Sequence, residues 1–419
     1  MKAEIISIGD ELLIGQTVNT NAAWLGENLN KIGIRVHRST TISDDKNEIL
    51  GALKETSSRS QVIIITGGLG PTKDDITKTT LCEYFGCGLA INEEALLRIT
   101  AFFQERGIPL LEENRLQAAL PEACTVIQNY RGTACGMWFE KDNVVYVSMP
   151  GVPYEMHTMM SDQVFPKLMQ HFKRPDILHR TILTIGAGES FIAKQIESWE
   201  NSLAEHDIKL AYLPSPGMVK LRMSMYSGEP KEQQQVIEKK EKELLEIIGP
   251  LVYGYEKDTL QLVIGDLLRG RGETLSVAES LTGGFLAHLI TQVSGSSDYF
   301  VGSVTSYINR IKEDELEVSG KMIEEKNVVS SEVAEAMAIG IRKKFKTDWA
   351  VATTGIAGPA GGTTDIPLGA VWIAVASDLG VKSFCFKFGK NRIQNIEMAA
   401  NTALNVLRKE ILAVNSVKS

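Results

Sequence analysis

The chain has 419 residues, of which 43% are hydrophobic and 23% are charged. This length exceeds what one hydrophobic core usually supports, so the composition predicts a globular protein of several domains. The net charge of −8 excludes proteins that hold nucleic acid through a generally positive surface. The apolar runs are shorter than a membrane span and the sequence shows no signal-peptide core, which favours a cytoplasmic protein without membrane contacts. The five cysteines contain no C-x-x-C pair, which favours reduced cysteines and no zinc site.

The first segment alternates predicted strands and helices. Buried strands are predicted over residues 3–8 and 61–66, and helices over residues 20–32, 44–56 and 76–85. Strands that alternate with helices in this way predict a mostly parallel sheet covered by helices on both faces. The expected fold of this segment is a three-layer α/β/α domain.

A glycine-rich turn, residues 66–72, joins the second of these strands to the next helix. Such a turn can cradle an anion with its backbone N–H groups, although it is neither a Walker A loop nor a dinucleotide fingerprint. Two acidic pairs, Asp10 with Glu11 and Asp74 with Asp75, follow the two strands. Their oxygens suit a divalent cation, and Asp74 and Asp75 equally suit the first turn of a helix.

The next segment has a different order of predicted elements. The sequence predicts a strand over residues 179–185 and a helix over 189–203. Two strands, 209–213 and 218–226, follow and are joined by a Pro-Ser-Pro-Gly turn, and a second helix is predicted over 229–248. This order predicts a small α+β domain. Its stretch rich in lysine and glutamate is typical of a solvent-exposed helix face.

The C-terminal segment carries the pattern that says most about chemistry. The apolar run 274–277 precedes Ala278-Glu279-Ser280-Leu281-Thr282-Gly283-Gly284, and a helix is predicted from Phe285 onward. A serine at a turn between a strand and a helix lies where unpaired backbone N–H groups and the helix dipole favour negative charge. The pattern fits a nucleophilic serine, a serine that binds phosphate, or a serine that only caps the helix.

Two later predicted strands also end in polar or glycine-rich residues. The first leads to Tyr307, Asn309 and Lys312, and the second leads to the loop 355–362. Open α/β sheets bind ligands at the carboxyl ends of their strands, so these residues and Ser280 are expected to form one site. A lysine can act as base for a serine if its pKa is lowered; a lysine at this position can equally be a solvated surface residue.

These blocks together resemble the CinA (competence/damage-inducible protein A) family. The C-terminal segment is similar to its nicotinamide mononucleotide deamidase domain in the Ser280 turn, in Tyr307-x-Asn309-x-x-Lys312, in Gly355-Ile356-Ala357-Gly358-Pro359-x-Gly361-Gly362 and in Pro367-x-Gly369-x-Val371. The resemblance implies an α/β/α amidohydrolase that needs no cofactor. It would convert nicotinamide mononucleotide and water into nicotinate mononucleotide and ammonia.

The resemblance also implies roles for individual residues of this domain. Ser280 is expected to be the nucleophile, Lys312 its base, and Tyr307 an orienting group or proton relay. A second arginine that relatives often carry about one turn after Arg392 appears here as Ile396. The substrate or the developing oxyanion is expected to contact Thr282, Gly283, Gly284, Asn309, Gly358, Gly361, Gly362 and Arg392.

The first segment resembles the molybdenum-cofactor-biosynthesis-like domain of the same family. The matching blocks are Gly9-Asp10-Glu11-Leu12-Leu13, residues 66–75 and Met149-Pro150-Gly151-Val152-Pro153. The resemblance implies a metal-dependent ADP-ribose pyrophosphatase that releases AMP and ribose 5-phosphate, although the sequence lacks a Nudix box. A divalent metal ion is expected on Asp10, Glu11, Asp74 and Asp75. The nucleotide is expected on Asn21, Gly67, Gly68, Gly70, Thr72, Pro150 and Gly151.

The middle segment resembles the KH-like linker domain of the family, but it lacks the basic Gly-x-x-Gly loop with which KH domains clamp RNA. The predicted domains are residues 1–174, 175–255 and 256–419, and the middle domain is expected to be a spacer that helps to form a homodimer. The expected partners are nicotinamide mononucleotide and ADP-ribose, in the recycling of pyridine nucleotides. Two alternatives stay open: a deamidase whose N-terminal domain only binds a nucleotide or pterin, and a non-enzymatic partner protein in DNA uptake or repair.

Overall fold

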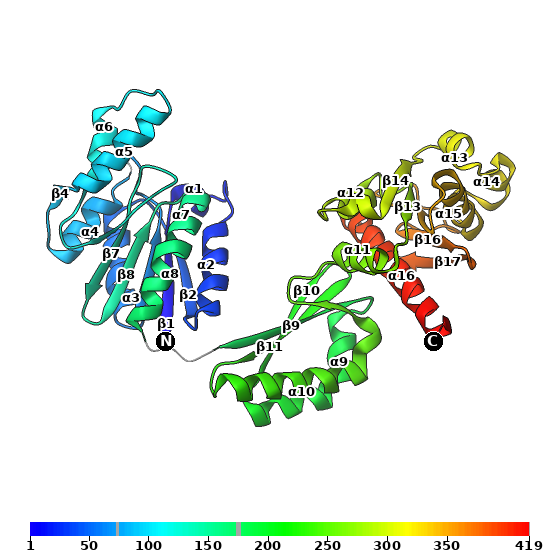
Figure 1. Cartoon of the computed structure of the whole chain (residues 1–419), viewed down its shortest axis with the longest axis horizontal. Coiled ribbons are helices and arrows are strands. Elements are labelled where there is room, and N and C mark those ends of the chain that lie inside the picture. Colours follow the sequence, from blue (N-terminus) through cyan, green and yellow to red (C-terminus); the bar gives the residue numbers. More distant parts are fainter. Residues whose placement is uncertain (73–74, 173–176, 419) are drawn as a thin grey trace. The chain divides into compact units, whose positions relative to one another are not determined.

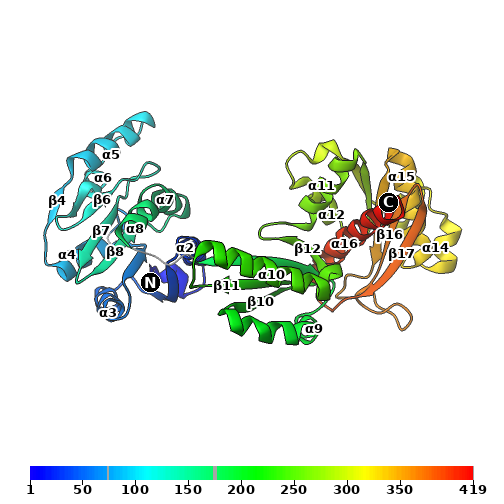
Figure 2. The same cartoon turned by 60° about the horizontal axis from the view of Figure 1, so that its bottom comes forward.

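The computed structural model describes residues 1–72, 75–172 and 177–418. The chain divides into two compact units, Met1–Ile177 with Tyr226–Pro230 and Leu178–Met225 with Lys231–Ser419. Figures 1 and 2 trace the chain from blue at the N-terminus to red at the C-terminus. Among the described residues, no helix combines the length and the apolar character needed to cross a membrane.

The first unit is built around a six-stranded sheet. Its strands are β1 (Lys2–Ile8), β2 (Arg35–Ile42), β3 (Val62–Thr66), β6 (Thr125–Ile127), β7 (Gly136–Lys141) and β8 (Val144–Met149). They lie in the order β2-β1-β3-β8-β7-β6, in which the first four are parallel and the last two antiparallel. A separate antiparallel pair is formed by β4 (Leu89–Ile91) and β5 (Ala119–Pro121).

Helices cover both faces of this sheet, because side chains of its central strands alternate between two hydrophobic cores. One core joins Ile64 to Leu25, and the other joins Ile65 to Leu53 and Leu81. The helices are α1 (Asp10–Leu13), α2 (Thr20–Lys31), α3 (Lys46–Ser57), α4 (Thr77–Phe85), α5 (Glu93–Glu105), α6 (Glu112–Arg115), α7 (Pro153–Met159) and α8 (Phe165–His171). The predicted three-layer domain with a mostly parallel sheet is confirmed.

The second unit begins with a four-stranded antiparallel sheet in the order β10-β11-β9-β12, whose strands are β9 (Leu178–Ile185), β10 (Lys209–Ser215), β11 (Met218–Met225) and β12 (Val252–Tyr255). Two helices, α9 (Glu189–Ser202) and α10 (Pro230–Ile248), pack on one face of it. Figure 1 shows both helices below the strands. This is the small α+β domain that the sequence predicts.

The rest of the unit contains a five-stranded sheet in the order β14-β13-β15-β16-β17. Its strands are β13 (Leu275–Glu279), β14 (Phe300–Thr305), β15 (Trp349–Gly355), β16 (Ala370–Ser377) and β17 (Gly380–Lys387), of which the first three are parallel. One face is covered by α11 (Leu260–Arg271), α12 (Phe285–Thr291) and α16 (Arg392–Lys418). The other face is covered by α13 (Asn309–Leu316), α14 (Gly320–Lys326) and α15 (Ser331–Phe345). Figure 2 shows α11 and α16 on one side of this sheet and α14 and α15 on the other, so the predicted α/β/α fold is confirmed.

The two sheets of the second unit share a hydrophobic core. Leu183 and Ile185 of β9 and Tyr253 of β12 belong to the same buried cluster as α11, α12 and α16. A polar contact reinforces the junction, because Nη1 of Arg408 donates to the carbonyl oxygen of Val252 at 3.0 Å. The α+β domain and the C-terminal domain are therefore packed together.

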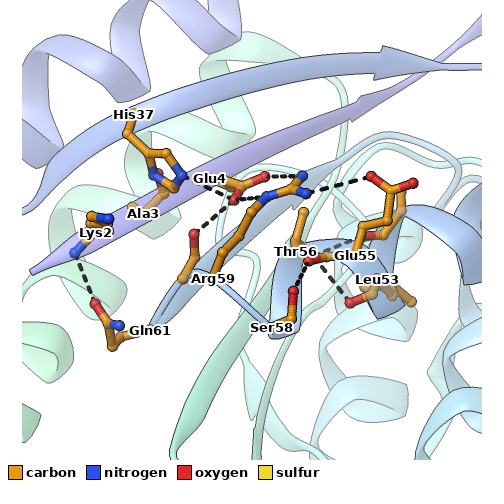
Figure 3. A network of polar contacts seen from close by, with 12 residues as sticks. Lys2, Ala3, Glu4, His37, Leu53, Glu55, Thr56, Ser58, Arg59 and Gln61 are labelled. Atoms are coloured by element: carbon orange, nitrogen blue, oxygen red, sulfur yellow. Dashed lines mark hydrogen bonds and ion pairs between the residues drawn. The ribbon is translucent and has the colours of Figure 1, made fainter.

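A buried ionic network lies at the start of β1. The carboxylate of Glu4, which is 1% exposed, accepts hydrogen bonds from Nε and Nη2 of Arg59 at 2.7 and 2.9 Å and from Oγ of Ser60 at 2.8 Å. His37 lies 3.3 Å from the same carboxylate, as Figure 3 shows. Burial raises the pKa of Glu4, but the hydrogen bonds from Arg59 and Ser60 and the charge of Arg59 outweigh it and hold that pKa below its ordinary value. The network therefore ties β1 to β2 and to the segment before β3.

Replacing Glu4 by glutamine is expected to lower the melting temperature of the first unit by roughly 2–8 °C, because a neutral amide cannot make charge-assisted bonds to Arg59. Glu4 contributes its full stabilisation of the folded state at pH values above the ordinary carboxyl pKa. This stabilisation is lost as the pH falls through the lower pKa that Glu4 has in the folded state. Calorimetry from about pH 7 down to about pH 2 should show that the difference in melting temperature between the wild type and Glu4→Gln shrinks as the pH falls. Glu105→Gln, at an exposed position in α5 away from this network, is the control, and equal melting of all three proteins at neutral pH would contradict the prediction.

Candidate functional site

Ser280 lies in the turn between β13 and α12, at the carboxyl end of the C-terminal sheet. Its side chain is nearly buried, and its backbone N–H donates to the carbonyl oxygen of Thr353 in β15 at 3.0 Å. Gly283 and Gly284 have φ angles of +60° and +99°, which residues with a β-carbon rarely adopt. The two glycines thus allow the chain to turn sharply from the strand into the helix behind Ser280.

The buried carboxylate of Glu279 organises this turn. Its oxygens accept hydrogen bonds from the backbone N–H groups of Gly284, Leu286 and Ala287 at 3.0, 3.0 and 2.9 Å. These are N–H groups that the start of a helix would otherwise leave unpaired. The protein itself therefore caps α12, which corrects the expectation that the N-terminus of this helix is open to a ligand.

Two backbone N–H groups of the turn, those of Leu281 and Thr282, have no hydrogen-bond partner among the described residues. They follow Ser280 directly, whereas the N–H of Gly283 donates back to the carbonyl oxygen of Ser280 at 3.2 Å. The hydroxyl of Thr282 is bonded to that of Thr353 at 2.8 Å. A pair of unpaired N–H groups beside a nucleophile can stabilise a negatively charged oxygen.

Lys312 of α13 brings its amine to Ser280. The side chain is 0% exposed, and Nζ lies 3.2 Å from Oγ of Ser280 and 2.6 Å from the carbonyl oxygen of Ser306. Burial lowers the pKa of Lys312 to about 8, so part of the population is neutral near pH 7. A neutral amine can donate one hydrogen bond to Ser306 and direct its lone pair at the hydroxyl proton of Ser280. The structure thus brings together the serine and the lysine that the sequence paired.

Tyr307 and Arg392 meet at an exposed position. Nη2 of Arg392 donates to the hydroxyl of Tyr307 at 3.0 Å, and Nη1 donates to the carbonyl oxygen of Gly358 at 2.7 Å. Tyr307 is 58% exposed. Its hydroxyl therefore contacts the residue expected to bind phosphate rather than the amine of Lys312, which fits an orienting role better than a proton relay.

The remaining predicted residues of this domain lie in the segments around these groups. Asn309 is the exposed first residue of α13, and Gly358, Gly361 and Gly362 lie in the loop between β15 and β16. A β-carbon on Gly362 would lie 2.8 Å from the backbone nitrogen of Leu368, so the packing of this loop requires glycine there.

Sequence reasoning missed three residues that shape the site. Glu279 and the carbonyl group of Ser306 hold the turn and the amine, and Nδ2 of Asn395 bridges the carbonyl oxygens of Ala357 and Gly389 at 2.9 and 3.0 Å. A carboxylate at the end of an otherwise apolar strand was a usable signal for Glu279. No comparable signal marks Ser306 or Asn395, because their contacts join segments that are separated in the sequence.

A second candidate site is a crevice of about 460 Å³ at the carboxyl ends of β1, β3 and β8. Nδ2 of Asn21 donates to the carbonyl oxygen of Gly151 across it at 2.7 Å. Thr72 is not among its lining residues; its backbone N–H and hydroxyl both donate to Oδ2 of Asp75. Of the residues predicted to bind the nucleotide or metal, the crevice is lined by Glu11, Asn21, Gly67, Gly68, Gly70, Asp75, Pro150 and Gly151.

The predicted metal ligands do not assemble in the part of the chain that the structure describes. Asp74 lies outside the described residues, and among the described ones no group of three or more His, Cys, Asp or Glu can hold a metal ion. The side chain of Asp10 is exposed, and Asp75 accepts hydrogen bonds from Thr72 within the preceding turn. Asp75 therefore does not lie in the first turn of a helix, which was the other expectation, because α4 begins only at Thr77. Two further carboxylates line the crevice: Asp44, from the loop before α3, and Glu155, from the first turn of α7. The divalent ion stays a prediction.

Replacing Glu279 by glutamine is expected to lower the free energy of unfolding of the second unit by about 2–4 kcal/mol, because an amide places an NH₂ group against backbone donors. Hydrogen exchange at the amides of Leu286 and Ala287 should accelerate at least about tenfold. Glu332→Gln, in the first turn of α15, serves as the matched control. Unchanged exchange at both amides would show that Glu279 does not hold the turn.

Comparison with known proteins covers nearly the whole chain. Residues 4–170 match the "Probable molybdopterin binding domain", residues 179–254 the "Damage-inducible protein CinA KH domain" and residues 257–411 the "CinA C-terminal domain". The chain is 48% identical over 414 residues to a CinA-like protein of Flavobacterium psychrophilum, which spans 98% of this chain and 99% of the relative. It is 45% identical over 413 residues to a CinA-like protein of Cytophaga hutchinsonii, which spans 98% of each chain. These matches confirm the resemblance, and the chain belongs to the CinA family.

Proposed function

We propose that the C-terminal domain hydrolyses the carboxamide of nicotinamide mononucleotide to give nicotinate mononucleotide and ammonia. The observation that carries this proposal is the 3.2 Å contact between the buried amine of Lys312 and the hydroxyl of Ser280. The two groups lie beside unpaired backbone N–H groups, and amide hydrolysis by a serine requires this combination of nucleophile, base and oxyanion stabilisation. The resemblance to the family supplies the identity of the substrate.

In the first half of the proposed reaction, the neutral amine of Lys312 removes the proton of Ser280 as Oγ attacks the carboxamide carbon. The oxygen of the carboxamide becomes negatively charged and accepts hydrogen bonds from the N–H groups of Leu281 and Thr282. The carbonyl oxygen of Ser306 meanwhile stabilises the ammonium form of Lys312. When the C–N bond breaks, this ammonium group returns its proton to the leaving nitrogen, which departs as ammonia.

In the second half, water attacks the ester carbon and Lys312 again accepts the proton. The bond between carbon and Oγ of Ser280 breaks, and Oγ takes the proton back from Lys312. One water is consumed and the amide is replaced by a carboxylic acid. A base with a pKa of about 8 suits both halves, because it can accept a proton near neutral pH and still release it to the leaving group.

We infer that Arg392 binds the phosphate group of the nucleotide. Its two hydrogen bonds, to Tyr307 and to Gly358, use two of the five N–H groups of the guanidinium. The other N–H groups remain for phosphate oxygens, which guanidinium groups bind in pairs. In this interpretation Tyr307 is a positioning residue that orients Arg392.

For the N-terminal domain we propose the hydrolysis of ADP-ribose to AMP and ribose 5-phosphate. The support is the family resemblance together with a crevice that combines the turn at Gly67 and Gly68 with the carboxylates of Glu11 and Glu155. A glycine-rich turn before a helix suits a pyrophosphate. The described acidic residues do not form a metal site by themselves, so the divalent ion that the resemblance implies for this hydrolysis is part of the proposal. A domain that only binds a nucleotide is the competing function.

Replacing Ser280 by alanine is expected to reduce ammonia release from nicotinamide mononucleotide by at least about 10³-fold, because the attacking oxygen is lost. AMP release from ADP-ribose should stay at the wild-type rate, because that site lies in the other unit. Conversely, EDTA should stop AMP release and leave ammonia release unchanged. An enzymatic ammonia assay and chromatography of AMP measure the two activities.

Ser296→Ala is the matched control and should keep both activities. Loss of both activities in a folded Ser280→Ala protein would refute the assignment of two separate sites. If no divalent ion supports AMP release while ammonia release is normal, the N-terminal domain is a binding domain.

The deamidase activity is expected to rise with pH and to reach half of its plateau near the Lys312 pKa of about 8. The sign follows from the mechanism, because only the neutral amine can accept the proton of Ser280. Lys312→Arg should abolish this rise and lower kcat/KM at least about 10²-fold. Measurement of kcat/KM between about pH 6 and 10 tests the prediction, and a flat or falling profile across this range would contradict it.

A further inference from the structure

A cavity of about 750 Å³ lies inside the second unit, at the junction between the α+β domain and the C-terminal domain. The α+β domain contributes residues 185–189, between β9 and α9, and the turn between β10 and β11. The C-terminal domain contributes β17 and α16. None of the residues assigned above to amide hydrolysis lines this cavity.

One wall of the cavity is aromatic. Phe384 and Phe386 alternate along the edge strand β17 and project from one face of it, and Phe388 follows directly after its last residue. The rings of Phe386 and Phe388 are 6.2 Å apart and inclined by only 8°. Met218 and Met398 complete the apolar lining. Aromatic rings and thioether groups pack favourably against the flat face of an aromatic ring in a ligand.

The cavity also contains a fixed hydrogen-bond donor, Asn405. Its side chain is 6% exposed, and its Oδ1 accepts bonds from Nε and Nη2 of Arg408 at 3.2 and 3.0 Å. Arg408 is itself anchored to the carbonyl oxygen of Val252. The amide therefore cannot flip without placing its NH₂ group against the guanidinium.

Nδ2 of Asn405 has no hydrogen-bond partner among the described residues. It faces Gly186 at the wall of the cavity, since a β-carbon on Gly186 would lie 3.9 Å from it. This nitrogen is not one of the fully enclosed unpaired atoms of the described residues, so it is accessible from the cavity. A bound molecule with an acceptor atom would satisfy this donor.

The charges around the cavity favour an anion. Lys387 and Lys409 line it, whereas the lining carboxylate of Glu410 is neutralised by Lys382 at 2.6 Å, which leaves Glu189 as the remaining acidic side chain. Gly188, the N-cap residue of α9, provides no side-chain cap, so the first N–H groups of this helix are available to an anion at the same wall.

We propose that this cavity binds an aromatic mononucleotide. The base would pack against the phenylalanine wall and accept a hydrogen bond from Asn405, and the phosphate would lie near Lys387, Lys409 and the start of α9. The volume is in the range of small-molecule sites. Such a ligand would contact both domains of the second unit. The site goes beyond the proposed hydrolyses, because it shares no residue with either of them.

AMP titrated into the full-length chain, labelled at its methionine methyl groups, tests the proposal by NMR. Saturable shifts are expected for Met218 and Met398, assigned through Met218→Leu and Met398→Leu. Adenosine and inorganic phosphate should each bind at least tenfold more weakly than AMP, because each lacks one half of the recognised chemistry. No shift of either methyl group at millimolar AMP, or shifts confined to Met149 beside the N-terminal crevice, would overturn the proposal.

Two variants with different chemistry make the test specific. Asn405→Asp keeps an oxygen for Arg408 but removes the donor, and the double variant Lys387→Glu with Lys409→Glu reverses the charge at exposed positions. Both should weaken AMP binding at least tenfold. Lys194→Glu, an exposed residue of α9 outside the cavity, and Ser280→Ala should bind AMP like the wild type. Unchanged affinity in the first two variants would refute the site, whereas failure of the deamidase proposal would appear in the Ser280 activity assay alone.

Discussion

The buried amine of Lys312 is the constraint on which the functional interpretation of this structure depends. An amine at the surface keeps its charge and cannot accept a proton near neutral pH, whereas the side chain of Lys312 is fully buried and its amine lies between Ser280 and Ser306. Burial disfavours the charged form and turns the side chain into a base. The same enclosure holds the amine beside the hydroxyl, so packing supplies both the position and the reactivity.

Both glycine-rich turns at strand ends use an acidic residue in a similar way. Glu279 binds three backbone N–H groups at the start of α12, and Asp75 binds the backbone N–H and hydroxyl of Thr72 in the N-terminal unit. In each case a carboxylate next to the turn satisfies donors that would otherwise be unpaired. Acidic residues beside such turns therefore shape the binding surface, and their presence alone does not identify a metal site.

The junction in the second unit combines a shared hydrophobic core with a polar anchor. Tyr253 and Ile185 pack into the core under α16, and Arg408 joins α16 to the carbonyl oxygen of Val252. Arg408 also fixes the amide of Asn405 at the cavity. The residues that hold the two domains together thus also orient the donor of the proposed nucleotide site.

The sequence alone predicted two α/β/α domains with an α+β domain between them and the pairing of Ser280 with Lys312. Of the six strands in the N-terminal sheet it predicted only β1 and β3. Hydrophobic periodicity and turn residues are local properties, and the family motifs are contiguous blocks, so both can be read along the chain. Three features of the site follow from the folded structure and not from the sequence: Lys312 is buried, Glu279 caps α12, and Tyr307 contacts Arg392. Burial and hydrogen-bond partners depend on residues from distant segments, and no local pattern specifies which of them meet.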